Sequence, residues 1–325
     1  MTVRAATEQD IPQIIGLLKK SLGESLLPKS EAFWRWKHLD NPFGASPVIA
    51  AEDEGRLIGL RAFMRWQWQR DGQQYSALRA VDTATHPDYQ GRGIFKKLTL
   101  QLLKDCKNDG DHFIFNTPNE KSKPGYLKMG WSEVGKIPVR LKPERPVRLI
   151  LNKFFPKNPA TGERLDLQDF KIERFFKNTS GLSWLDDTPL IPGKIYTRKT
   201  SAFLKWRYAD CPVRTYSAAG GDNFLIIFYL KNHHIGKELR IVEAFGKNAK
   251  PIGQAFKMIK KQLKPDFISI APPADARVKS VLDKLWFLPP RNIGPVLTFK
   301  SLNVAEKDFL DIERWAYSLG DFELF

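Results

Sequence analysis

Cysteine and histidine are both scarce in this sequence of 325 residues, which has two cysteines and five histidines. The cysteines, Cys106 and Cys211, lie far apart, so they cannot build a disulfide framework. This favours a reducing compartment and predicts a cytoplasmic location. Cys and His spacings typical of a zinc site are also missing, and we expect no bound metal.

Long apolar runs are missing as well. The longest uninterrupted one, Phe224 to Leu230, is far shorter than the roughly 20 residues that span a bilayer. The first 20 residues show no signal-peptide pattern, so no membrane span is expected. Hydrophobic residues make up 42% of the chain, enough to bury a core.

The charge is strongly positive, with 52 Lys and Arg against 36 Asp and Glu, a formal net charge of +16. Such a balance favours anionic partners: nucleic acid, a membrane surface or a phosphorylated cofactor. Two common phosphate-binding motifs are absent. No P-loop is found, and Lys96 stands where the dinucleotide motif needs its third glycine.

The order of predicted elements indicates a mixed sheet covered by helices. Period-two alternation, helical spacing and turn signals predict strands over 3–6, 48–51, 58–68, 74–85, 112–117 and 134–141. Helices are expected from Thr7, with Asp10 in a capping box, from Ile94, and around 126–129. A start rich in hairpins followed by strand–helix alternation predicts an α/β fold.

Three segments of the first half recur in the same order in the second. Residues 33–42 are echoed by 203–212, residues 78–82 by 239–243, and residues 113–118 by 267–272. The ordered set predicts two tandem copies of one fold. We expect an N-terminal domain over 1–142, a basic connector over 143–181, and a degenerate second copy over 182–325 that ends in a helix.

The junction between the strand ending at Thr85 and the helix from Ile94 contains Gly91 and Gly93. Amides at a helix N-terminus lack intrahelical partners, and glycines let the backbone approach a ligand closely. A diphosphate is the ligand that such a loop favours, and Arg92 would add positive charge. A plain β–α turn is the alternative.

The loop Gln90–Ile94 resembles motif A of the GCN5-related N-acetyltransferase (GNAT) superfamily, although Phe95 departs from its small final residue. The preceding segment 81–87, the opening 3–11 and the segment Asn119…Ser122…Tyr126…Gly130-Trp131 resemble other family segments at family spacing. The resemblance covers about residues 1–142.

The resemblance implies a cofactor site in a gap between two strands. Pantetheine would pair with the backbone of one strand while the diphosphate binds the loop amides. The implied cofactor-binding residues are Thr83, Ala84, Thr85, Gln90, Gly91, Arg92, Gly93, Ile94, Phe95 and Asn119.

Acyl transfer to an amine needs a proton donor for the departing thiolate and an acceptor for the ammonium proton. By resemblance, Tyr126 is the catalytic acid, and a core tyrosine is the alternative. Asp82 is the candidate base, directly or through water, and a structural hydrogen bond is equally plausible. His86 reads better as a loop-fixing residue, and the carboxylate of Phe325 is a further candidate base.

Together these features predict an N-acetyltransferase that moves an acetyl group from acetyl-CoA to a primary amine by direct attack. The second copy lacks the G-x-G spacing, so we expect it to bind no CoA and to pack against the first. Two alternatives stay open. One is a Fem-like transferase using aminoacyl-tRNA, which the positive charge would suit, and the other is a non-catalytic CoA-binding or scaffolding module.

Overall fold

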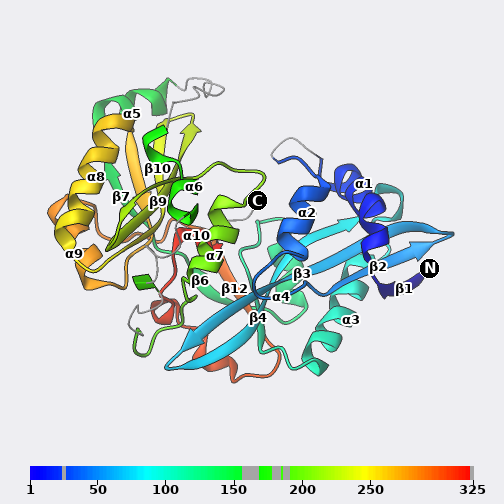
Figure 1. The fold of residues 1–325 in the computed structure, drawn as a ribbon. Coiled ribbons are helices and arrows are strands. Elements are labelled where there is room, and N and C mark those ends of the chain that lie inside the picture. The colour runs from blue at the N-terminus through cyan, green and yellow to red at the C-terminus, as the bar shows by residue number, and fades with distance from the viewer. Residues whose placement is uncertain (24–26, 156–167, 178–183, 186–190, 323–325) are drawn as a thin grey trace.

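Two mixed β-sheets, each flanked by helices, carry the fold of this computed structural model (Figure 1). The structure describes residues 1–23, 27–155, 168–177, 184–185 and 191–322. The first sheet has the order β1 (Thr2–Ala5), β2 (Val48–Asp53), β3 (Arg56–Arg70), β4 (Gln73–Thr85), β5 (Phe113–Asn116), β12 (Val296–Ser301), β6 (Ser132–Lys136). The second has the order β7 (Arg140–Pro143), β11 (Phe267–Ile270), β10 (Gly236–Gly246), β9 (Phe224–His233), β8 (Ser217–Gly221). The predicted α/β class with two mixed sheets is confirmed.

Helices cover both faces of the first sheet. On one face lie α1 (Ile11–Leu22) and α2 (Glu31–His38), and on the other α3 (Ile94–Asn108) and α4 (Lys123–Lys128). The outer face of the second sheet carries α8 (Ala249–Leu263) and α9 (Ala276–Lys284). Shorter helices are α5 (Pro146–Phe154), α6 (Glu173–Lys177), α7 (Ser201–Leu204) and α10 (Leu319–Phe322). Among the described helices, none is long and apolar enough to cross a bilayer.

The start of α1 follows the sequence prediction. The backbone N–H of Thr7 donates to Oδ2 of Asp10 at 2.7 Å, which completes the predicted capping box. Nη1 of Arg4 lies 2.8 Å from the same oxygen and neutralises it. The expected apolar stripe then packs against β3 and β4.

The two sheets exchange strands. β12 comes from the end of the chain yet pairs with β5 and β6 in the first sheet, while β7 pairs with β11 in the second. The single strand predicted over 134–141 is therefore wrong. Pro138 interrupts it, because proline cannot donate to a ladder, and the two pieces enter different sheets. The expected boundaries at 142 and 182 stay predictions, but neither sheet is built from one side of them alone.

A shared apolar core joins the two sheets, as the sequence predicts for the packing of the second half against the first. At its centre Trp36 and Trp206 stack with ring centroids 5.0 Å apart. Nε1 of Trp36 donates to the Trp206 carbonyl at 2.7 Å, and Nε1 of Trp206 donates to the Trp36 carbonyl at 2.8 Å. Both residues belong to the repeated segment, so the two echoes meet face to face. Duplication remains an inference, which this reciprocal contact supports.

Candidate functional site

Strands β4 and β5 diverge soon after they meet. They pair in parallel at three positions, from Ala77 opposite Phe113 to Arg79 opposite Phe115. β4 continues to Thr85 with β3 as its neighbour on the other side. On the β5 side, its last six residues pair with no described strand, and such an edge offers hydrogen bonds to an extended chain.

The glycine loop lies directly beyond this edge. Gly91 has φ 76° and Gly93 φ 74°, a left-handed conformation that a side chain disfavours, and Gly93 is the N-cap of α3. A β-carbon at either position would meet nothing within 4 Å, so the backbone borders open space. The first amides of α3 lie at the positive end of the helix. The loop therefore has the geometry of an anion site.

The predicted loop residues differ in what they can offer. The exposed residues are Gln90, Gly91, Arg92 and Gly93. Ile94 is the first residue of α3, and its side chain is buried in the core between this helix and the sheet. Nη2 of Arg92 donates to the Asp88 carbonyl at 3.2 Å, and its guanidinium lies 4.8 Å from the Tyr89 ring. At Ile94, only the backbone amide is available to a ligand.

Tyr126 lies beside this loop on the α3 face of the sheet. Its ring, 6% exposed, meets Phe95 edge to face with centroids 5.9 Å apart. Phe95 packs against Tyr126 and the surrounding core cluster. The Tyr126 oxygen accepts a hydrogen bond from Nη1 of Arg61 at 3.0 Å. The tyrosine hydrogen is thereby left for another acceptor.

Arg61 is a site residue that the sequence reasoning missed. It comes from β3, is fully buried, and its Nη1 also donates to Thr83 on β4. Its Nε and Nη2 have no hydrogen-bond partner in the part of the chain that the structure describes. Buried donors without partners are rare and point to an absent ligand or water. A charged residue directly between two apolar ones, Leu60 and Ala62, was the available signal.

Asp82 faces the opposite side of the sheet from Thr83. It has φ 41°, and the register shifts there, with Arg61 opposite Thr83 but Ala62 opposite Val81. Such a bulge re-aims a side chain, here toward α2. Oδ2 of Asp82 lies 2.8 Å from Nζ of Lys37 and 2.8 Å from Nε2 of His38.

This cluster was also missed, because its members lie 44 and 45 positions apart. Burial alone would raise the pKa of Asp82, but the adjacent Lys37 ammonium holds that pKa far below its usual range. Burial lowers the pKa of Lys37 and of His38. The carboxylate is therefore ionised at neutral pH, and the imidazole is neutral.

The remaining predicted residues border the gap in different ways. The Ala84 side chain is buried among α1 and β3, so its backbone is what could face a ligand, while Thr85 is half-buried at the strand end. Asn119 is exposed beyond β5, and its Oδ1 accepts from the Ser122 N–H at 2.9 Å. His86 is buried, and its Nδ1 accepts from the Asp88 N–H at 3.4 Å. Phe325 lies outside the described residues.

The Asp82 cluster makes a pH-dependent contribution to stability. Asp82→Asn leaves the Lys37 ammonium buried without its partner and should lower the free energy of unfolding at pH 7 by about 3 kcal/mol. Because the folded-state pKa of Asp82 is depressed, the stabilisation is present above its unfolded pKa of 3.8 and is lost as pH falls below it. Denaturant titrations at pH 7 and pH 3 should show the difference between variant and native protein shrinking at pH 3.

The matched control is Asp88→Asn, whose side chain is 74% exposed. It should change the free energy of unfolding by less than about 0.5 kcal/mol at both pH values. An Asp82→Asn deficit of equal size at pH 7 and pH 3 would rule out the ionised pair.

Comparisons with known proteins cover residues 2–134 in one case and nearly the whole chain in others. Residues 2–134 match the family model described as "Acetyltransferase (GNAT) domain". An L-amino acid N-acyltransferase of Escherichia coli is 26% identical over 95 residues, 28% of this chain, and the match spans about half (54%) of that relative. A probable N-acyltransferase from Enterococcus faecalis has TM-score 0.61 at 12% identity, covering 93% of this chain and 73% of its own. A GCN5-related N-acetyltransferase from Anabaena variabilis has TM-score 0.57 at 14% identity with the same coverage.

At such identities the two structures show likeness of fold alone, and that likeness extends over nearly the whole chain. The family model, in contrast, matches the part that contains the diverging strands, the glycine loop and Tyr126. Residues 2–134 of the chain are therefore similar to a GNAT acetyltransferase domain.

Proposed function

We propose that this protein is an N-acyltransferase that moves the acetyl group of acetyl-CoA to a primary amine by direct attack. The observation that carries the proposal is the meeting of two features at one place. The open edge of β4 ends where the left-handed glycines lead into α3. An extended amide chain and a diphosphate are the two parts of CoA that need such partners.

The proposed cofactor contacts follow from this placement. The backbone of Thr83, Ala84 and Thr85 would pair with pantetheine, and the amides of Gln90–Phe95 would hold the diphosphate. Arg92 is exposed beside them and adds positive charge. Asn119 borders the far side of the gap. Acetyl-CoA supplies an activated thioester, and the open space at Gly91 and Gly93 suits its diphosphate.

Tyr126 is the proposed acid. As the amine nitrogen bonds to the carbonyl carbon, the bond from that carbon to sulfur breaks, and the thiolate needs a proton. Because the Tyr126 oxygen accepts from Arg61, its own hydrogen can be donated to the sulfur. The Arg61 charge also stabilises negative charge that develops on the phenol oxygen.

His38 is the proposed base, and Asp82, the candidate base of the sequence, holds it in position. A carboxylate with so low a pKa is a weak proton acceptor on its own. Nε2 of His38 is held by Asp82 at 2.8 Å, while its Nδ1 is buried and has no hydrogen-bond partner among the described residues. The neutral imidazole can take the ammonium proton at Nδ1 through a water, and the carboxylate stabilises the imidazolium that forms.

The two alternative functions make different demands on the same site. A Fem-like transferase would use aminoacyl-tRNA and would not need the diphosphate geometry of the glycine loop. A non-catalytic module would bind CoA but would not need a Tyr126 hydroxyl that is free to donate its hydrogen because its oxygen accepts from Arg61. Ultraviolet absorbance of the purified protein would show co-purified RNA and so identify the Fem-like transferase. Thioester turnover with amines would distinguish the N-acyltransferase from the non-catalytic module.

Gly93→Val should weaken CoA binding at least roughly tenfold by calorimetry, because a branched side chain would occupy the space proposed for the diphosphate. Gly110→Val is the matched control, since Gly110 also has a positive φ, 85°, and open space around it at the other end of α3. Both variants place a branched residue at a positive φ and so share the backbone strain. Equal CoA affinities in the two variants would therefore show that the glycine loop does not bind CoA.

Tyr126→Phe should reduce thiol release from acetyl-CoA with a panel of primary amines by roughly 10- to 1000-fold while leaving CoA affinity unchanged. The hydroxyl is lost, but the ring keeps its contacts with Phe95 and Trp131. Full activity of the variant would exclude Tyr126 as acid. If the native protein binds CoA but no amine raises thiol release above background, the enzymatic proposal fails.

A further inference from the structure

The second sheet contains a divergence like that of the first, and a cavity lies inside it. β10 and β11 pair in parallel over four positions, ending with Ile241 opposite Ile270. β10 continues to Gly246, and a cavity of about 580 Å³ lies between this continuation and the segment after β11. Its size is within the range of small-molecule sites.

The cavity repeats the geometry of the first site with different chemistry. Glu243 corresponds in the sequence echo to Asp82, and a register shift again precedes it, between Ile241 and Glu243. Tyr208, in the echo of His38, donates to Oε1 of Glu243 at 2.6 Å. Gly246 at the strand end is not in a left-handed conformation, so the diphosphate loop has no counterpart here.

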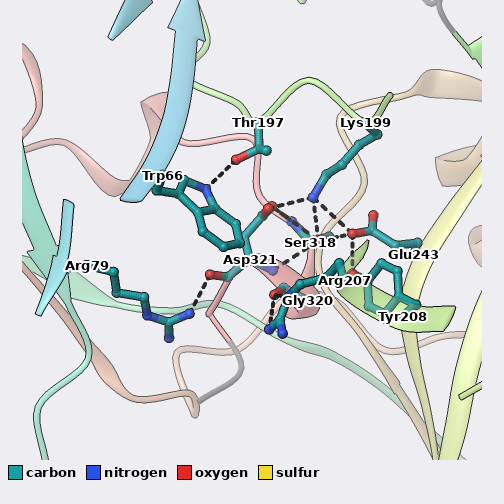
Figure 2. A network of polar contacts seen from close by, with 10 residues as sticks. All are labelled: Trp66, Arg79, Thr197, Lys199, Arg207, Tyr208, Glu243, Ser318, Gly320 and Asp321. Carbon is teal, nitrogen blue, oxygen red and sulfur yellow. Dashed lines mark hydrogen bonds and ion pairs between the residues drawn. The ribbon is translucent and has the colours of Figure 1, made fainter. Parts of the chain in front are cut away.

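The floor of the cavity is a buried polar network (Figure 2). Nζ of Lys199 donates to Oε1 of Glu243 at 2.9 Å, to Oγ of Ser318 at 3.1 Å and to Oδ1 of Asp321 at 2.5 Å. Lys199, Glu243 and Ser318 line the cavity. Since Lys199 donates to all three of these partners, the described part of the floor offers no free cation to an anionic group of a ligand.

The walls are apolar but include two orphaned polar atoms. Trp184 and Tyr196, 7% and 8% exposed, both line the cavity. Among the described residues, Nε1 of Trp184 and the hydroxyl of Tyr196 are buried without hydrogen-bond partners. Such groups cost free energy unless a partner arrives. An oxygen acceptor on a bound molecule would satisfy either donor.

The rim is positively charged. Arg198 and Lys247 are exposed there, and Arg277 is held by Asp275. Lys247 thus brings an exposed positive charge to the mouth. Opposite charge would therefore be attracted to the mouth, while the apolar walls favour a hydrophobic body below it.

We propose that this cavity is a second ligand site, distinct from the CoA site, which takes an amphipathic organic carboxylate with a carbonyl oxygen in its body. The carboxylate lies at the rim near Lys247, the apolar body contacts the walls, and the carbonyl accepts from the Trp184 or the Tyr196 donor. The carboxylate is inferred from the charge at the rim, the apolar body from the walls, and the carbonyl oxygen from the buried donors.

Calorimetric titration of the full chain with 3-benzoylpropionate tests this, because that molecule combines an aromatic body, a ketone and a carboxylate. We expect one site per chain, and we expect the neutral 3-benzoylpropanamide to bind at least roughly tenfold more weakly than the acid. No binding of the acid at millimolar concentration, or equal binding of acid and amide, would overturn the proposal.

Variants locate the binding. Lys247→Glu should weaken it at least roughly tenfold, whereas Lys261→Glu, an equally exposed lysine away from the cavity, should leave it unchanged. Ala274→Trp should block the mouth, since Ala274 is exposed and lines the cavity. Gly93→Val should bind the probe normally, which separates this site from the proposed CoA site. Unchanged affinity in both Lys247→Glu and Ala274→Trp, or loss of binding in Gly93→Val, would contradict the assignment.

Discussion

The short pairing of β4 with β5 is the constraint on which the site depends. Three paired positions hold the strands together, and beyond them β4 follows β3 while β5 turns away. This leaves backbone groups of one strand facing a gap, and the next segment brings the helix amides of α3 to its mouth. Were the pairing longer, the edge would be satisfied by β5 and no extended molecule could replace it.

The second half of the chain fixes this geometry from outside. β12 extends the first sheet beyond β5, so β5 is held between two neighbours although it is only four residues long. The C-terminal segment adds a second connection. The carbonyls of Asp321 and Phe322 accept from Arg79, which is the last residue of β4 that pairs with β5. The Asp321 carboxylate binds Lys199 at the floor of the cavity in the second sheet (Figure 2). One short segment thus contacts both divergences.

Local features could be predicted from the sequence, and long-range ones could not. The capping box at Thr7 and the glycine loop depend on residues close in the chain, and each lies where the pattern places it. The strand exchange depends on pairing between residues 160 to 188 positions apart, and only Pro138 hinted at it. The direction of the Asp82 side chain depends on one bulge, and a shift of one residue reverses the face. Arg61 was missed because its significance rests on partners that only the fold assembles.

Hydrogen–deuterium exchange with and without CoA tests the central claim most directly. The account predicts added protection of the backbone amides in residues 80–85 and 90–97, where the unpaired edge and the first turn of α3 would gain partners. It predicts no added protection in residues 242–246, at the corresponding position of the second sheet. Two results at saturating CoA would contradict the account: added protection confined to residues 242–246, or no added protection in residues 80–85 and 90–97.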